Sequence, residues 1–231
     1  MTAGAPPRRI LLLGRGRMGT LIESLAAEYG FAVAGYVDVD NVAGEWPDAD
    51  VAIDFSIPDA VPVNFPRLAE RGLSVVLGTT GWSAHEADIR ATAERAGIGV
   101  VAAPNFSVGV NLFSVIVAKA AEAFARHGEF GSWLHELHHA AKKDAPSGTA
   151  LALLQTMREA GYTAPIDVSS TRAGAIPGTH TVGFDGGGET ITLTHTARDR
   201  SIFARGALEA ARWIEGRRGW FTMRDVVGGG R

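Results

Sequence analysis

The chain contains no cysteine among its 231 residues. Disulfide bonds, thiolate metal sites and cysteine nucleophiles are therefore excluded. Positive charge is not in excess either, because 22 lysines and arginines stand against 25 aspartates and glutamates, for a net charge of −3. With this balance of charge we expect no nucleic-acid partner.

Long hydrophobic runs are also missing near the N-terminus. The first apolar run, Ile10–Leu13, stops at Gly14 and is too short for a signal peptide or a membrane span. We therefore expect a cytoplasmic protein with no membrane partner. Hydrophobic residues still make up 46% of the chain, which is enough for a substantial core in one large domain or two modest ones.

In the first half of the chain, short apolar runs of β type alternate with amphipathic helical patterns. This alternation predicts a parallel sheet covered by helices on both faces, with ligands at the carboxyl ends of the strands. The expected strands are Ile10–Leu13, Phe31–Val37, Val51–Phe55, Ser74–Leu77 and Gly99–Ala102, and the expected helices span residues 18–29, 59–71 and 85–96.

The pattern changes in the second half and indicates an α+β unit. Asp185–Gly188 is expected to form the turn of an antiparallel hairpin. The expected strands are Trp133–His139, Val168–Arg172, His180–Phe184 and Thr190–Thr196, and the expected helices span residues 111–124, 148–160 and 201–215.

A glycine-rich loop, Gly14-Arg15-Gly16-Arg17-Met18-Gly19, follows the first predicted strand and opens a helix. This is G-x-G-x-x-G in the context that indicates dinucleotide binding. The first glycine permits a tight turn, the second lets the backbone approach a pyrophosphate, and the third lets the helix pack on the strand. Asp38 ends the second predicted strand, where a carboxylate binds the adenosine ribose. The alternative is a glycine-rich turn with an unrelated surface aspartate.

Cofactor preference leans to NADH on these residues. Asp38 would repel a 2′-phosphate, and Val39 follows it instead of an arginine. Arg15 and Arg17 could reach a phosphate, so dual use of NADH and NADPH stays open; the alternative is that they are ordinary solvated side chains. Two further segments, Gly78-Thr79-Thr80-Gly81 and Ala103-Pro104-Asn105-Phe106-Ser107, end strands where the nicotinamide half would lie, unless they are loops that only close the sheet.

The most unusual stretch of the sequence is Glu136–Ala150, with two histidines, two lysines and an aspartate before a predicted helix. Ser147 is expected to cap that helix, so the backbone N–H groups of Gly148 and Thr149 would form an anion site suited to a carboxylate. Lys142 and a nearby histidine would add positive charge. The alternative is a histidine-rich surface turn with an ordinary cap. A metal site is disfavoured, since the two histidines are adjacent and no spaced third ligand is evident.

Glu136–Ala150 resembles the E-x-H-H-x-x-K-x-D-x-P-S-G-T-A signature of the 4-hydroxy-tetrahydrodipicolinate reductase (dihydrodipicolinate reductase) family, with every defined position present. The glycine loop Gly14–Gly19 is one residue shorter than the G-x-x-G-R-M-G of many members. Many members also have an arginine where Val39 stands. Both differences affect the expected choice between NADH and NADPH. Further matches follow in the family's order: Arg17-Met18-Gly19, Gly78–Gly81, Asn105–Asn111 and Arg224-Asp225-Val226.

The resemblance implies an NAD(P)H-dependent homotetramer of diaminopimelate and lysine biosynthesis. Its substrate would be a small cyclic dicarboxylate, hydroxy-tetrahydrodipicolinate, reduced to tetrahydrodipicolinate with loss of water. The implied fold is α/β. A Rossmann-type dinucleotide-binding domain would comprise residues 1–107 and 205–231, and an α+β domain for substrate binding and oligomerisation, with an open mixed sheet, residues 108–204.

The resemblance also assigns roles to single residues. His138 would donate the proton, Lys142 would assist acid catalysis and bind substrate, and His139, Gly148 and Thr149 would contact substrate carboxylates. We add Ser147 to the substrate-binding set because it begins the helix. The implied cofactor contacts are Gly14, Arg15, Gly16, Arg17, Met18, Gly19, Asp38, Gly78, Thr79, Thr80, Ala103, Pro104, Asn105 and Phe106.

Elementary chemistry is consistent with these roles. Histidine, with an unperturbed pKa near 6.5, supplies a proton near neutrality, and a cationic lysine stabilises developing negative charge. Two alternatives stay open at this point. One is another reductase of similar two-domain architecture, such as an amino-acid or aldehyde dehydrogenase. The other is a nicotinamide-sensing or scaffold protein without turnover.

Overall fold

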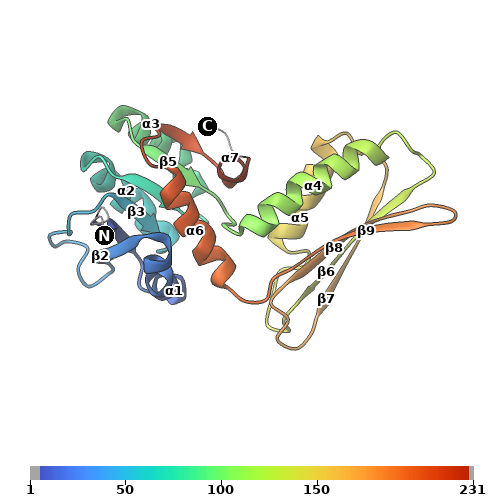
Figure 1. The fold of residues 1–231 in the computed structure, drawn as a ribbon, viewed down its shortest axis with the longest axis horizontal. Helices are drawn as coiled ribbons and strands as arrows, with labels where there is room; N and C mark the ends of the chain where they lie inside the picture. The colour runs from blue at the N-terminus through green and yellow to red at the C-terminus, as the bar shows by residue number, and fades with distance from the viewer. Residues whose placement is uncertain (1–5, 229–231) are drawn as a thin grey trace, which may run out of the picture. The chain divides into compact units, whose positions relative to one another are not determined.

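The structure, a computed structural model, describes residues 6–228, which form two units (Figure 1). Unit 1 contains the described residues up to Val108 together with those from Ser201 onward, and unit 2 is Gly109–Arg200. The chain therefore leaves unit 1 once and returns to it with its last elements. Within residues 6–228, no helix is both long and apolar enough to cross a membrane.

Unit 1 is built on a six-stranded parallel sheet in the order β10-β5-β4-β3-β1-β2. From β1 the chain winds outward in both directions, so the topological switch point lies between β1 and β3, where ligands bind in such sheets. The strands are β1 (Arg8–Leu13), β2 (Phe31–Val37), β3 (Val51–Asp54), β4 (Ser74–Leu77), β5 (Gly99–Ala102) and β10 (Gly219–Phe221).

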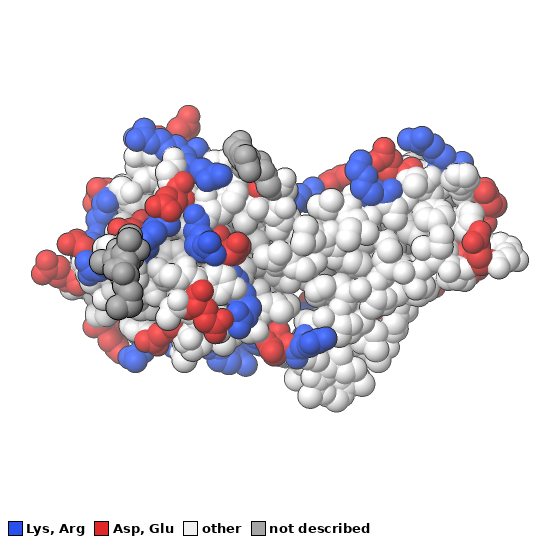
Figure 2. Space-filling view, in the orientation of Figure 1, with Lys and Arg blue, Asp and Glu red and all other residues white. Residues whose placement is uncertain are grey.

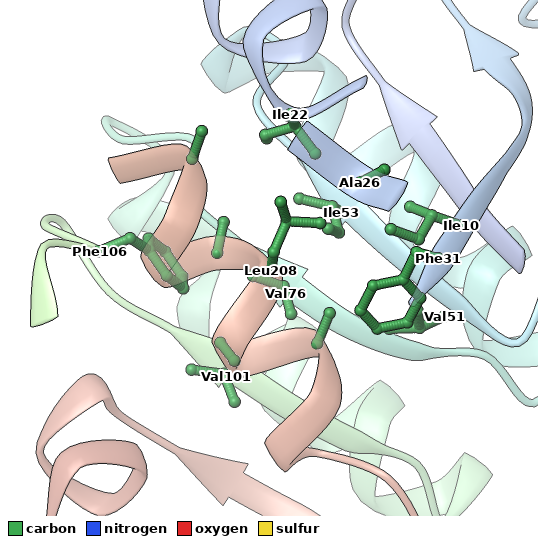
Figure 3. Close-up of a cluster of buried hydrophobic side chains, with 14 of the residues drawn as sticks. Ile10, Ile22, Ala26, Phe31, Val51, Ile53, Val76, Val101, Phe106 and Leu208 are labelled. Carbon is green, nitrogen blue, oxygen red and sulfur yellow. The ribbon is translucent and has the colours of Figure 1, made fainter. Parts of the chain in front are cut away.

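Helices cover both faces of this sheet because its strands are apolar on both sides. On one face, Leu208 of α6 lies among sheet residues that include Ile53 and Val76 (Figure 3). Leu11 and Val75 point to the opposite face. The first face carries α1 (Arg17–Ala26), α6 (Ser201–Trp213) and α7 (Met223–Val227), and the second carries α2 (Val61–Glu70) and α3 (Glu86–Ala96). Short 3-10 turns lie at η1 (Ala27–Tyr29), η2 (Pro58–Ala60) and η3 (Ser83–His85).

Unit 2 is an open mixed sheet covered on one face by two helices. The sheet order is β7-β6-β8-β9, with β6 parallel to β7 and the other pairs antiparallel. Alternation along β6 places Leu134, Glu136 and His138 on the helix-covered face, where Leu134 joins the hydrophobic core. The elements are α4 (Val108–Phe124), β6 (Gly131–His138), α5 (Gly148–Glu159), β7 (Ile166–Arg172), β8 (Thr179–Asp185) and β9 (Thr190–Thr196).

The predicted fold class is confirmed: a parallel α/β sheet and a second unit with a mixed sheet. The predicted strands and helices are all present, with ends that differ by a few residues; α4, for instance, begins at Val108 instead of Asn111. Two elements were not predicted, β10 and α7. Both are too short for an apolar periodicity to show, and β10 joins the sheet only through its pairing with β5.

Candidate active site

The glycine loop lies between β1 and α1, beside the switch point of the unit 1 sheet. Gly14 has φ +89°, in the left-handed region, and a Cβ there would lie 2.5 Å from the carbonyl oxygen of Phe55. A Cβ on Gly19 would lie 2.2 Å from the carbonyl oxygen of Gly14. Side chains are therefore excluded at both positions, as expected for the glycines that form the tight turn and the helix–strand contact.

Gly16, the second glycine of the loop, is a glycine for a reason other than packing. A Cβ there would meet no heavy atom within 4 Å, so protein packing does not require glycine. Gly16 is the N-cap of α1, and no side chain caps this helix. The start of α1 thus has no side-chain cap, and there is open space around the position of a Gly16 Cβ. This arrangement fits a pyrophosphate, which helix N-termini bind through backbone donors.

Asp38, directly after β2, is adjacent to the glycine loop. Its carboxylate accepts hydrogen bonds from the backbone N–H of Arg15 at 3.3 Å and of Val39 at 2.8 Å. The Arg15 guanidinium lies 4.9 Å from the centroid of the Tyr36 ring. The next side chain, Val39, is 75% exposed. The structure thus brings together the loop and the acid that the sequence predicted, with an exposed apolar residue after the acid.

The segment after β4 closes on a buried acid that the sequence analysis did not single out. Thr79 is buried, and its hydroxyl donates to Oδ1 of Asp54 at 2.8 Å. Its carbonyl accepts a hydrogen bond from the indole of Trp82 at 2.6 Å. Burial raises the pKa of Asp54, and hydrogen bonds from Ser56 and Thr79 oppose this rise. The side chain of Thr79 therefore stabilises the sheet edge, and its backbone N–H also donates within the protein, to the carbonyl oxygen of Asp54 at 3.2 Å.

The segment after β5 is anchored in the same way. Phe106 is only 2% exposed and packs edge to face on Phe55, with ring centroids 5.7 Å apart. The side-chain oxygen of Asn105 accepts a hydrogen bond from the backbone N–H of Ser107 at 2.9 Å. The Phe106 ring thus belongs to the core, so a cofactor contact at this residue would use its backbone. The other predicted contacts at this edge are partly or fully exposed: Gly78, Thr80, Ala103 and Pro104.

Glu136 is the centre of a buried polar network in unit 2. It is fully buried, and its Oε1 accepts hydrogen bonds from the backbone N–H of Ser147 at 3.0 Å, Ser170 Oγ at 2.8 Å and Arg172 Nη2 at 2.6 Å. Burial alone would raise the pKa of Glu136, but these hydrogen bonds lower it to about 2. An ionised carboxylate thus joins β6, β7 and the start of α5.

Two histidines face the other oxygen of this carboxylate. Glu136 Oε2 lies 3.4 Å from His138 Nδ1 and 3.6 Å from His180 Nε2. The two rings meet edge to face with centroids 5.0 Å apart. Burial lowers the pKa of both histidines, that of His180 to about 4, while Glu136 opposes the shift. Gly178, with φ +149°, borders the far side of the His138 ring, since a Cβ there would lie 3.1 Å from Nε2.

Ser147 caps α5 as predicted, because its Oγ accepts a hydrogen bond from the backbone N–H of Ala150 at 3.2 Å. The residue is buried, however, and Oγ also pairs with His180 Nε2 at 3.1 Å. The Ser147 side chain therefore holds the start of α5 against the histidine pair, and its contact with the substrate stays a prediction.

Lys142 and the start of α5 converge on a carboxylate of the chain itself. Lys142 Nζ lies 2.8 Å from Oδ1 of Asp144. This contact, together with a hydrogen bond from the backbone of Gly148, lowers the pKa of the Asp144 carboxyl. His139 belongs to the same turn, where its carbonyl accepts a hydrogen bond from the Lys142 N–H at 3.1 Å. Thr149 follows in the first turn of α5, so the predicted anion-binding groups lie together.

One cluster of His and acidic side chains in residues 6–228 is close enough to hold a metal: Glu136, His138 and His180, with ligand atoms within 4.8 Å of one another. Arg172 already forms an ion pair with this carboxylate, and Lys142 adds a second positive charge that acts on His138. Both positive charges would repel a divalent cation in this buried site, so we assign no metal to this cluster.

Sequence reasoning missed His180, Ser170 and Arg172. Strand pairing explains their place in the site: Glu136 lies opposite Ser170 of β7 and opposite His180 of β8, and His138 lies opposite Arg172. They are more than 30 residues from their partners along the chain. No spacing in the sequence signals such contacts, because strand register is decided only when the sheet forms.

Two family models match the chain. The model described as dihydrodipicolinate reductase, N-terminus, matches residues 8–106, and the one described as dihydrodipicolinate reductase, C-terminus, matches residues 109–227. Curated proteins named 4-hydroxy-tetrahydrodipicolinate reductase are similar over most of their length. The one from Stenotrophomonas maltophilia K279a is 42% identical and covers 96% of this chain and 98% of its own. The one from Archaeoglobus fulgidus is 38% identical and covers 92% of this chain and 96% of its own.

Solved structures show the same architecture. The dipicolinate-bound dihydrodipicolinate reductase from Paenisporosarcina sp. TG-14 matches with a TM-score of 0.77 at 22% identity, covering 94% of this chain and 97% of its own. GenD2 from gentamicin A biosynthesis, in complex with NAD, matches with a TM-score of 0.58 at 13% identity, covering 96% of this chain and 91% of its own. This match shows a shared fold alone. Since the two family models together match nearly all of the sequence, the chain belongs to the dihydrodipicolinate reductase family.

Proposed function

We propose that the protein reduces 4-hydroxy-tetrahydrodipicolinate to tetrahydrodipicolinate, the reaction for which its relatives are named, in diaminopimelate and lysine biosynthesis. One observation carries the proposal beyond family membership. The Asp144 carboxylate lies between Lys142 Nζ and the backbone of Gly148. A helix N-terminus and a lysine that already hold one carboxylate are suited to hold a carboxylate of a dianionic substrate.

The cofactor is a pyridine nucleotide. We propose that the Gly14–Gly19 loop and the start of α1 hold its pyrophosphate, that Asp38 binds the ribose, and that the loops after β4 and β5 border the nicotinamide. When bound, the nicotinamide supplies the hydride. We propose NADH as the preferred form, because Asp38 disfavours a 2′-phosphate and Val39 provides no cation. NADPH remains usable through Arg15 and Arg17, which are exposed in the loop.

The unit 2 residues bind the substrate and move one proton. Lys142 and the backbone N–H groups of Gly148 and Thr149 hold a carboxylate, with His139 as a further contact. Hydride addition leaves negative charge on the reduced C=C–C=N system, which Lys142 stabilises and His138 quenches by donating a proton. Nε2 is the donating atom, because Nδ1 faces Glu136 in the interior.

An initial-rate assay tests this function. Oxidation of NADH and of NADPH is followed side by side, with the substrate generated enzymatically in the same cuvette. We expect oxidation that depends on the substrate. Nucleotide binding without turnover would instead support a nicotinamide-sensing protein. Activity confined to a different substrate would support another reductase of this fold.

We also propose that the enzyme is a cytoplasmic homotetramer that assembles through unit 2, as the family resemblance implies. The sheet face opposite α4 and α5 carries uncharged cross-strand hydroxyl pairs, Thr179–Thr196 at 3.1 Å and Thr181–Thr194 at 3.0 Å. Figure 2 shows a broad area of unit 2 without Lys, Arg, Asp or Glu. Light scattering coupled to size-exclusion chromatography should give four chain masses, and a monomer would contradict this assembly.

A further inference from the structure

We infer that Glu136 is a positioning residue for the proton donor: through Nδ1 it orients the His138 ring and retains a proton on it, so that Nε2 is the atom from which the proton leaves. The inference rests on the proposed role of His138 as the acid, which the structure brings into contact with a fully buried carboxylate.

The Glu136 carboxylate is held rigidly by one of its two oxygens. Oε1 accepts from Ser147, Ser170 and Arg172, donors that come from the start of α5 and from β7. Oε2 has no hydrogen-bond partner within the described residues, and neither has Nδ1 of His138. These two atoms lie 3.4 Å apart. A proton on Nδ1 lets the two atoms pair as opposite charges, and burying either atom without a partner is costly.

Two histidines approach Oε2, and their surroundings differ. His180 Nε2 has a neutral partner in Ser147 Oγ at 3.1 Å, and burial lowers the pKa of His180 to about 4. His180 is therefore neutral at neutral pH. His138 Nδ1 has only Glu136 opposite it. Glu136 is thus the carboxylate that favours a proton on His138, the one of the two rings whose Nε2 borders Gly178 instead of Ser147.

Charges of both signs act on His138. Burial, Lys142 and Arg172 disfavour the protonated ring, whereas Glu136 and Asp144 favour it. These groups face the ring from β6, from the turn before α5 and from β7, and neutral His180 faces it from β8. Loss of the Glu136 charge would leave two cations against one exposed carboxylate. His138 would then be a weaker base and would hold its proton less well at neutral pH.

Glu136→Gln tests this role with little change of shape. The amide oxygen can retain the three donors on the Oε1 side, which places the amide N–H₂ against Nδ1 and favours the neutral ring. We expect kcat at pH 7 to fall at least about tenfold and KM to change less than about threefold. The limb on which activity falls with rising pH should move down by about one pH unit or more.

Ser170→Ala is the matched control. It removes one hydrogen bond from Oε1 and leaves Oε2 facing His138. We expect a lower Tm and an unchanged pH limb. If Ser170→Ala moves the pH limb as far as Glu136→Gln does, Glu136 acts only by holding the fold, and the inference is overturned.

A second readout does not depend on turnover. Histidine NMR titrations of the full-length protein, assigned with His138→Gln and His180→Gln, should show His138 titrating at a higher pH than His180. In Glu136→Gln the His138 midpoint should fall. An unchanged midpoint overturns the inference. If the Glu136→Gln variant does not fold, the wild type decides: a His138 midpoint at or below that of His180 also overturns the inference. A shifted midpoint in a protein without reductase activity would refute the proposed function and leave the positioning role intact.

Discussion

Replacing Gly16 with alanine should impair nucleotide binding without disturbing the fold. Gly16 has φ −74° and ψ −169°, a conformation open to alanine, and the new Cβ would have no heavy atom within 4 Å. Alanine makes the unfolded chain less flexible than glycine does, which stabilises the variant by about 0.4–1 kcal/mol. Alanine is also a poorer N-cap of α1 than glycine, which costs roughly the same. We therefore expect the free energy of unfolding to change by less than about 0.5 kcal/mol. A methyl group in the space proposed for the pyrophosphate should weaken binding at least about tenfold, or ~1.4 kcal/mol.

Gly19→Ala adds the same methyl group where the structure has no room. Its Cβ would lie 2.2 Å from the backbone oxygen of Gly14. Overpacking of this kind costs about 1–3 kcal/mol, which lowers Tm by roughly 2–12 °C in a chain of this size. Thermal unfolding by circular dichroism and NADH titration by fluorescence measure both variants. The reasoning is refuted if Gly16→Ala lowers Tm as much as Gly19→Ala does, or binds NADH with the wild-type Kd.

Other substitutions test the site residues one at a time. His138→Gln should lower kcat by roughly 10²–10⁴-fold in steady-state assays, and an unchanged kcat would remove His138 as the proton donor. Lys142→Ala should raise KM and lower kcat, and normal values of both would contradict the anion site. Val39→Arg should raise kcat/KM for NADPH relative to NADH, because it adds a cation beside Asp38; an unchanged ratio would count against our account of cofactor choice. Burial lowers the pKa of His180 from 6.5 in the unfolded chain to about 4 in the folded protein. Between these two pH values unfolding takes up a proton, so the folded state loses stability as the pH falls. Urea titrations of the wild type should show a loss of about 3 kcal/mol between pH 6.5 and 4. His180→Gln should lose less, and an equal loss would show that another group is responsible.

Much of unit 1 could be predicted because its signals are local. Its central strands contain short apolar runs buried on both faces, as in Leu11 and Leu12, which point to opposite cores. The glycine loop is equally local, since turn, helix start and strand contact all fall within Gly14–Gly19. The exception is β10, whose three residues carry no pattern and join the sheet by pairing with β5.

The unit 2 site was predictable only in part. The Lys142 turn and the Ser147 cap follow from neighbouring residues, so the sequence indicated an anion site there. The direction of the Ser147 side chain did not follow, because its partner His180 lies on a strand 33 residues away. The same holds for Thr79, whose hydroxyl turns to Asp54 and not outward.

By itself, the sequence determined the fold class, the family, the nucleotide loop and the Glu136–Ala150 segment, because these depend on residues that are neighbours along the chain. Only the tertiary structure decided what surrounds His138. The register of β6 with β7 and β8 sets Ser170, His180 and Arg172 around Glu136. Register depends on contacts between distant segments and on which face each strand buries, so these partners become visible only in the folded sheet.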